Sequence, residues 1–337
     1  MIDPELTLAA GVQPQFDYAD PTAARARIAR MGATLVDKKY WKELEAAVTY
    51  HERSIPGAAG GPAVPVRIYT PNETVPGRGA TVFFHGGGFM VGDLNVEHYR
   101  CLTWARDTGA VLVSCDYRLC PEHRFPAAAD DCLTCYRWVV DNAADLGIDR
   151  SRIVVAGVSA GGNLAASVSL MCRDRCLQMP CLQMLIYPAL DDRMTSQSMH
   201  VHTDKPGWRR IDTQHMWAHY LGPKVRDVSI YAAPAHATDL SGLPRAYVMT
   251  AELDPLRDEA LDYAMRLMAA GVPVDLRNFA GAFHGFDVVR EAPLSRAALD
   301  EQVLMINRAL TSARPASAPT GAPAVANNPQ PSQSAEA

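Results

Sequence analysis

A serine enclosed by glycines, in the segment Gly157-Val158-Ser159-Ala160-Gly161-Gly162, constrains the fold of this chain more than any other feature. The segment follows the apolar run 153–156 and precedes a helix-prone stretch, so the pattern predicts a strand, a sharp turn and a helix. Glycines beside such a turn avoid the clashes that side chains would cause. The turn would expose the Ser159 hydroxyl as a candidate nucleophile, although a purely structural Gly/Ser turn explains the segment about as well when it is considered alone.

A second glycine-rich segment, His85-Gly86-Gly87-Gly88-Phe89, follows the apolar run 81–84. Glycines at a strand end leave backbone N–H groups unshielded, and such groups can stabilise negative charge that develops on an oxygen. The alternative is a phosphate-binding loop, but neither a Lys-Ser/Thr pair nor a G-x-G-x-x-G pattern accompanies the segment. The candidate oxyanion donors are therefore the N–H groups of Gly86, Gly87, Gly88 and Ala160.

A nucleophilic serine needs a base, and the base needs an orienting acid. His284 lies among small residues in a loop that follows a predicted strand, which suits a base. Asp254 follows another predicted strand and suits the acid, although Asp also suits a helix N-cap, and Glu252 and Asp258 compete for the role. The chain order serine, acid, histidine is the order found in α/β-hydrolases.

These motifs and the segment 116–128, Asp-Tyr-Arg-Leu-Cys-Pro-Glu-His-Arg-Phe-Pro-Ala-Ala, together resemble the hormone-sensitive-lipase-like family of α/β-hydrolase esterases. The resemblance covers roughly residues 45 to 310. Val158 and Cys120 depart from the family's pattern, which usually has Asp or Thr at the first position and Ala at the second. The departure at Val158 leaves the subfamily open.

The resemblance implies a fold and an activity. The fold is the α/β-hydrolase fold, with a mostly parallel eight-stranded sheet, helices on both faces and a helical cap. The activity is that of a serine carboxylesterase acting on short- to medium-chain esters, with Ser159 as nucleophile, His284 as base and Asp254 as its orienting acid. No cofactor is implied.

Two other functions fit parts of the pattern. An amide hydrolase or deacetylase would use the same three residues. A non-catalytic small-molecule receptor would use the same fold, as in the plant gibberellin receptors, which resemble this family but have lost the histidine. The presence of His284 favours an enzyme over a receptor.

Alternating strand and helix patterns predict one large α/β domain with additions. Two early strands, near 50–53 and 64–69, are joined by too short a loop for a helical crossover and should pair antiparallel at the sheet edge. The charges of Asp116, Arg118 and Glu122 lie so near a core strand that we expect them to be paired. We expect a core at residues 46–188 and 241–312, an N-terminal helical cap segment at 1–45, a cap insertion at 189–240 and a disordered Ala/Pro/Ser-rich tail at 313–337.

The insertion carries Met and Trp side chains, which adapt to varied apolar ligands. Packing of the insertion on the body explains any single one of them equally well. The substrate-pocket candidates are Phe89, Trp208, Met216 and Trp217.

The composition limits the classes of partner that this chain is expected to bind. The net charge of −5 argues against nucleic acid, and no apolar run is long enough to span a membrane. The eight cysteines and the absence of a signal-peptide pattern are typical of a cytoplasmic protein. His215 and His219 have metal-compatible spacing without an intervening Glu, and Cys132 and Cys135 lack a second pair, so we expect no metal site. A small-molecule ester is the expected partner, and a homodimer is a candidate assembly.

Overall fold

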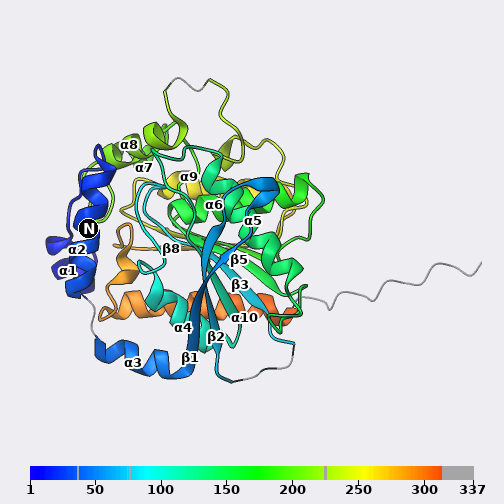
Figure 1. Cartoon of the computed structure of the whole chain (residues 1–337). Coiled ribbons are helices and arrows are strands. Elements are labelled where there is room, and N and C mark those ends of the chain that lie inside the picture. Colours follow the sequence, from blue (N-terminus) through cyan, green and yellow to red (C-terminus); the bar gives the residue numbers. More distant parts are fainter. Residues whose placement is uncertain (36–37, 74, 76, 224–225, 313–337) are drawn as a thin grey trace, which may run out of the picture.

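The computed structural model describes residues 1–35, 38–73, 75, 77–223 and 226–312, so the predicted tail at 313–337 lies outside the described residues. One eight-stranded sheet forms the centre, in the order β1-β2-β4-β3-β5-β6-β7-β8 (Figure 1). Its strands are β1 (Val48–Ile55), β2 (Val64–Pro71), β3 (Ala80–Phe84), β4 (Val111–Cys115), β5 (Ile153–Val158), β6 (Leu182–Ile186), β7 (Ala246–Ala251) and β8 (Val274–Phe279). The α-helices are α1 (Thr7–Val12), α2 (Pro21–Leu35), α3 (Lys38–Ala47), α4 (His98–Thr108), α5 (Ala127–Asp141), α6 (Ala160–Asp174), α7 (Gln197–Val201), α8 (Arg210–Leu221), α9 (Arg257–Ala269) and α10 (Pro293–Ser312).

The central strands are apolar along their whole length because both faces of the sheet are covered. Every residue of β3 is buried, and successive side chains point to opposite faces. Val82 and Phe84 belong to the core beneath α5, α6 and α9. Phe83 belongs to the core beneath α4 and α10, where it meets Trp104 edge-on. The sheet therefore separates two hydrophobic cores.

The first two strands behave as their short connection predicts. β1 pairs antiparallel with β2 along its full length, and β2 pairs antiparallel with β4. The remaining pairs, from β4 across to β8, are parallel. The mostly parallel eight-stranded sheet predicted for this chain is confirmed.

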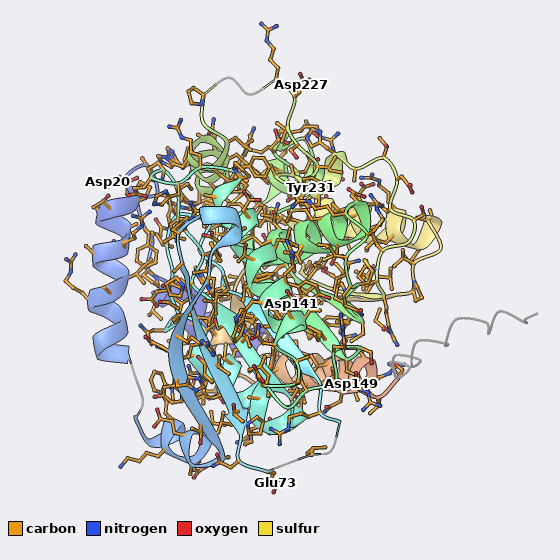
Figure 2. The ribbon with its side chains drawn as sticks, turned by 45° about the vertical axis from the view of Figure 1, so that its right-hand side comes forward. Asp20, Glu73, Asp141, Asp149, Asp227 and Tyr231 are labelled. Carbon is orange, nitrogen blue, oxygen red and sulfur yellow. The ribbon has the colours of Figure 1, made fainter. Side chains whose placement is uncertain are left out.

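The insertion and the first N-terminal helices lie at one end of the molecule. In Figure 2, Asp20, which precedes α2, lies at the same end as Asp227 and Tyr231 of the insertion. Glu73 and Asp149, which precede β3 and β5, lie at the opposite end. The insertion and α2 thus cover the end where the parallel strands finish.

The helix α3 packs elsewhere. It contacts α4 and β1, and Trp41 of α3 meets the ring of His98 edge-on, with ring centroids 5.3 Å apart. The segment 1–45 is therefore divided: α1 and α2 lie near the insertion, whereas α3 lies beside the antiparallel edge of the sheet (Figure 1).

The charged residues after β4 are paired in part. Arg118 forms an ion pair with Asp131 of α5 at 2.8 Å, and Glu122 forms one with Arg25 of α2 at 2.8 Å. The prediction that Asp116 is also paired is wrong: its side chain has no hydrogen-bond or ion-pair partner among the described residues. Burial, together with the nearby carboxylates of Asp93 and Glu52, raises the pKa of Asp116 to about 6.

Candidate active site

The candidate residues lie where parallel strands end. Ser159 follows β5, Asp254 follows β7, His284 follows β8, and residues 85–89 follow β3. The carboxyl ends of parallel strands share one edge of the sheet, and the crevice outside that edge is where α/β proteins bind ligands.

Ser159 occupies a strained turn. Its φ of 56° and ψ of −116° are rarely adopted by a residue with a side chain. A methyl group on Gly157 would lie 2.0 Å from the carbonyl oxygen of Gly161, and one on Gly161 would lie 2.0 Å from that of Phe84. Both glycines are therefore required for β5 to turn directly into α6. Val158, the departure from the family pattern, is buried against the second core.

A chain of hydrogen bonds joins the three residues. The Nδ1 atom of His284 lies 2.5 Å from Oδ2 of Asp254, and its Nε2 atom lies 3.0 Å from Oγ of Ser159. A carboxylate can only accept, so Nδ1 carries the hydrogen and Nε2 is free to accept the serine proton. All three side chains are at least nine-tenths buried. This arrangement can deprotonate the serine as it attacks.

The three competing carboxylates have different partners. Asp254 contacts His284, whereas Glu252 accepts a hydrogen bond from the backbone of Gly281 at 2.6 Å. Asp258 accepts one from the backbone of Ser198 at 2.7 Å. Asp254 also accepts from the backbone N–H of Leu256, so it caps the following turn as well. The structure therefore brings Asp254, rather than its neighbours, to the histidine.

The segment 86–90, which we call the glycine turn, lies beside the serine. A methyl group on Gly86 would lie 3.6 Å from Cβ of Ser159. Gly87 and Gly88 have φ values of 120° and 60°, and a methyl group on Gly87 would lie 2.1 Å from the carbonyl oxygen of Val91. Within the described residues, the N–H groups of Gly86, Gly87, Gly88 and Ala160 have no hydrogen-bond acceptor. They are available to an oxygen bound beside Ser159.

His85, which directly follows β3, stabilises the glycine turn through a hydrogen bond. Its Nδ1 atom donates to the carbonyl oxygen of Gly86 at 2.7 Å, and its ring stacks on Tyr117 at 4.2 Å. Burial lowers the pKa of His85 to about 4, so the ring is neutral at pH 7. Its role in this position is support of the backbone.

One residue that contacts the His284 ring was not predicted from the sequence. Tyr187, just after β6, packs edge-on against His284 with ring centroids 4.6 Å apart. Its hydroxyl donates to Asp287 at 2.7 Å, and Asp287 accepts from Arg100 at 3.0 Å. These partners are 100 and 187 residues apart, so no local pattern could have predicted the network.

The four pocket candidates are packed together around the glycine turn. Phe89 stacks on Tyr220 at 3.8 Å and lies 6.1 Å from Trp217. A methyl group on Gly88 would lie 2.9 Å from Trp208 and 3.5 Å from Met216. All four candidates are less than 5% exposed. Whether they line the substrate pocket stays a prediction.

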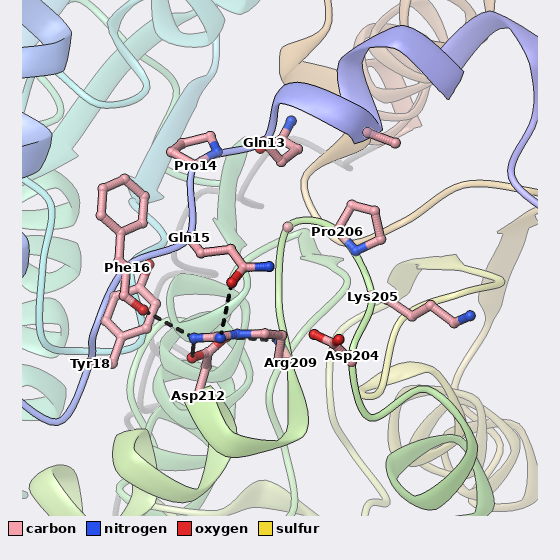
Figure 3. A pocket seen from close by; sticks show the side chains of 12 residues that line it. Gln13, Pro14, Gln15, Phe16, Tyr18, Asp204, Lys205, Pro206, Arg209 and Asp212 are labelled. Atoms are coloured by element: carbon pink, nitrogen blue, oxygen red, sulfur yellow. Dashed lines mark hydrogen bonds and ion pairs between the residues drawn. The ribbon is translucent and has the colours of Figure 1, made fainter.

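A polar cavity of about 160 Å³ lies between the N-terminal segment and the insertion, and Tyr18 is among the residues that line it (Figure 3). The Trp208 ring packs on His284 at 5.8 Å and on Tyr18 at 5.1 Å. The cavity is lined by residues of the N-terminal segment 13–18 and of the insertion. The Nη2 atom of Arg209, in the insertion, donates a hydrogen bond to the carbonyl oxygen of Phe16 at 3.1 Å. The insertion and the N-terminal segment form a cover over this end of the sheet, and Ser159 is 4% exposed.

Metal-binding residues are sparse. Among the described residues, one group, Asp191, Asp192 and His236, is close enough to hold an ion, and it does not include His215 and His219. Its members already pair with one another or with Arg193. Within the same residues, no helix has the length and apolar character needed to cross a membrane.

The sheet and the strand-end residues together have the organisation of an α/β-hydrolase. The model of a family described as "alpha/beta hydrolase fold" matches residues 81–288. The chain is 37% identical to Carboxylesterase NlhH of Mycobacterium tuberculosis, over 92% of this chain and 96% of that protein. It is 42% identical to the solved structure of a bacterial heroin esterase, with a TM-score of 0.87, over 92% of this chain and 98% of that one. It is 31% identical to bovine (Bos taurus) arylacetamide deacetylase, over 66% of this chain and 72% of that protein.

The chain belongs to the hormone-sensitive-lipase-like family of α/β-hydrolases, the family that its motifs resemble.

Proposed function

We propose that this protein is a serine carboxylesterase that hydrolyses short- to medium-chain carboxylic esters through an acyl-enzyme. The carboxylesterase and esterase names of its relatives support the reaction class. The observation that carries the proposal is the hydrogen-bonded chain from Ser159 through His284 to Asp254, which lies beside unpaired backbone N–H groups.

The mechanism follows from this geometry. Ser159 Oγ attacks the ester carbonyl carbon while His284 Nε2 takes the hydroxyl proton, and Asp254 stabilises the imidazolium that forms. The N–H groups of Gly87, Gly88 and Ala160, with Gly86 as a further candidate, bind the oxyanion. The imidazolium then gives its proton to the leaving alcohol oxygen. Water, deprotonated by the same nitrogen, attacks the acyl-enzyme and releases the carboxylic acid and free Ser159.

The test is the removal of the nucleophile and the base. Ser159→Ala and His284→Ala should each lower kcat on p-nitrophenyl butyrate by roughly 10³-fold or more, with unchanged circular dichroism. The exposed Ser241 and His51 provide matched controls, and their alanine variants should retain wild-type rates. If Ser159→Ala or His284→Ala kept more than about a tenth of wild-type activity, the assignment would be wrong.

An amide hydrolase is the second candidate, and the similarity to arylacetamide deacetylase favours it. Amides need a protonated leaving nitrogen, which His284 would supply in the same way as for an alcohol. Rates on a matched acetate ester and acetanilide distinguish the two. A higher kcat/KM on the anilide would make amide hydrolysis the main activity.

We also propose a cytoplasmic location and retain the homodimer as a prediction. All eight cysteines are free, and six are buried, as in a reducing compartment. Cell fractionation tests the location. Sedimentation velocity tests the oligomeric state.

A further inference from the structure

An arginine of the N-terminal helix α2 is joined directly to the glycine turn. The Nε atom of Arg25 donates to the carbonyl oxygen of Met90 at 2.6 Å. The Met90 backbone N–H in turn donates to the carbonyl oxygen of Gly87 at 3.0 Å. Arg25 is therefore linked through the single residue Met90 to the backbone of Gly87 and Gly88, whose N–H groups are two of the proposed oxyanion donors.

The same guanidinium also binds the segment after β4. Its Nη2 atom donates to the carbonyl oxygen of Cys120 at 2.7 Å, and it forms a two-pronged ion pair with Glu122, both bonds being 2.8 Å. This hydrogen bonding lowers the pKa of Glu122 to about 2. The Cys120 N–H donates to the carbonyl oxygen of Phe89 at 2.9 Å. Arg25 thus bridges the two segments that hold the glycine turn.

The glycine turn needs such support. Gly87, Gly88 and Phe89 have consecutive positive φ values, and that of Phe89, 59°, is costly for a residue with a side chain. Among the described residues, the N–H groups of its three glycines have no acceptor. The backbone bonds that hold the turn are therefore those accepted by its carbonyl oxygens at Gly86, Gly87, Phe89 and Met90. A strained segment with few bonds persists only when its surroundings fix it.

We propose that Arg25 is a positioning residue for oxyanion stabilisation, so that helix α2 is a working part of the catalytic apparatus in addition to covering it. The proposal rests on the function proposed above, in which Gly87 and Gly88 bind the oxyanion. The planar fork of the guanidinium reaches both carbonyl oxygens and both Glu122 oxygens at once, which an ammonium group cannot do. Oxyanion donors act only when they are placed within a few tenths of an ångström of the developing charge.

Three variants test the proposal in the full chain, with rates normalised by active-site titration using a fluorophosphonate. Arg25→Ala should lower kcat per active site by about 10- to 100-fold, with KM changed less than about threefold, because the ground state uses the oxyanion donors little. Arg25→Lys should fall between Arg25→Ala and wild type. Glu122→Gln should cost less than Arg25→Ala, because the guanidinium still binds Met90 and Cys120.

The binding of an aryl trifluoromethyl ketone separates positioning from mere stability. The ketone forms a hemiketal whose oxyanion occupies the same donors, so its inhibition constant should rise by the same factor as kcat/KM falls. If Arg25 only anchored helix α2, its loss would lower the melting temperature but leave the inhibition constant and kcat/KM per active site unchanged. Arg30→Ala, an exposed arginine on the same helix, is the matched control and should behave as wild type.

The inference is overturned if Arg25→Ala and Arg25→Lys both stay within threefold of wild type in kcat per active site and in ketone binding. If Arg25→Ala does not fold, Arg25→Lys decides alone, and at least a threefold loss in both quantities is expected. Failure of the underlying function has a different signature, since Ser159→Ala would then remain active. An inactive Ser159→Ala with normal Arg25 variants rejects this inference only.

Discussion

The Asp254 carboxylate is shared between two structural tasks. One oxygen binds His284, and the other accepts from the backbone of Leu256. An amide at this position would still satisfy Leu256 but would no longer hold the histidine in one tautomer. The fold and the activity therefore depend on different halves of the same side chain.

This division gives a prediction for the acid. Asp254→Asn should leave the melting temperature near that of wild type and lower kcat by roughly 10²- to 10⁴-fold. Steady-state kinetics and calorimetry measure the two effects. Glu252→Gln and Asp258→Asn are the matched variants, and a larger loss of kcat in either would mean that the acid is misassigned.

The histidines give a prediction for pH. A histidine must be neutral to act as general base, so kcat/KM should fall as the pH is lowered from about 8 to about 5. Burial lowers the pKa of both His85 and His98 to about 4, so neither titrates in that range. A kcat/KM profile that stays flat from pH 5 to 8, on a substrate whose binding is not rate-limiting, contradicts the histidine base.

Sequence alone predicted Ser159 and His284 because each lies in a local motif at a strand end. Local context alone left the acid open, because Asp254, Glu252 and Asp258 share one stretch and differ in what they meet in three dimensions, and Asp254 was chosen on the family resemblance. Arg25 lay wholly outside that reasoning. Its partners lie 65 to 97 residues away, and an arginine on an exposed-looking helix carries no signal of them.

At the scale of elements, the strand β4 is followed directly by Asp116, a carboxylate without an ion-pair partner among the described residues. The sequence predicted a partner for Asp116 because a buried charge is costly. Among the described residues its side chain has no hydrogen-bond or ion-pair partner, and the charge of Arg67 offsets the cost only in part. The positions of whole elements show a similar limit. The alternation of strands and helices and the antiparallel pairing of the first two strands followed from apolar runs and loop lengths. The place of α3 did not, since its amphipathic pattern does not specify which surface it covers.

The raised pKa of Asp116 gives a prediction for stability. Its value of about 6 lies above the ordinary 3.8, so the folded state holds the proton more tightly, and stability is lost as the pH rises from about 4 through 6. Asp116→Asn, which stays neutral, should raise the melting temperature by roughly 1–3 °C at pH 8 and leave it unchanged near pH 4. Asp300→Asn, at an exposed position on α10, is the control. Destabilisation by Asp116→Asn at pH 8 would mean that the carboxylate has a favourable partner.

For the whole molecule, the closed cover over Ser159 predicts the range of substrates. Each buried methylene contributes about 0.8 kcal/mol until the space beneath the cover is full, after which further methylenes must stay in water or force the cover open. The kcat/KM on p-nitrophenyl esters should therefore peak between acetate and about hexanoate or octanoate and then drop steeply. Emulsified long-chain triglycerides should be poor substrates without interfacial activation. A preference for palmitate over butyrate would make the protein a true lipase.

The position of Trp208 gives the protein an optical reporter of its own. Its indole lies between the imidazole of His284 and the phenol of Tyr18. A protonated imidazole quenches the emission of a neighbouring indole, and withdrawal of the N-terminal segment would admit water and shift that emission to the red. The difference between the fluorescence of wild type and of Trp208→Phe thus records the charge on the histidine through its intensity and the opening of the cover through its wavelength, with no attached dye.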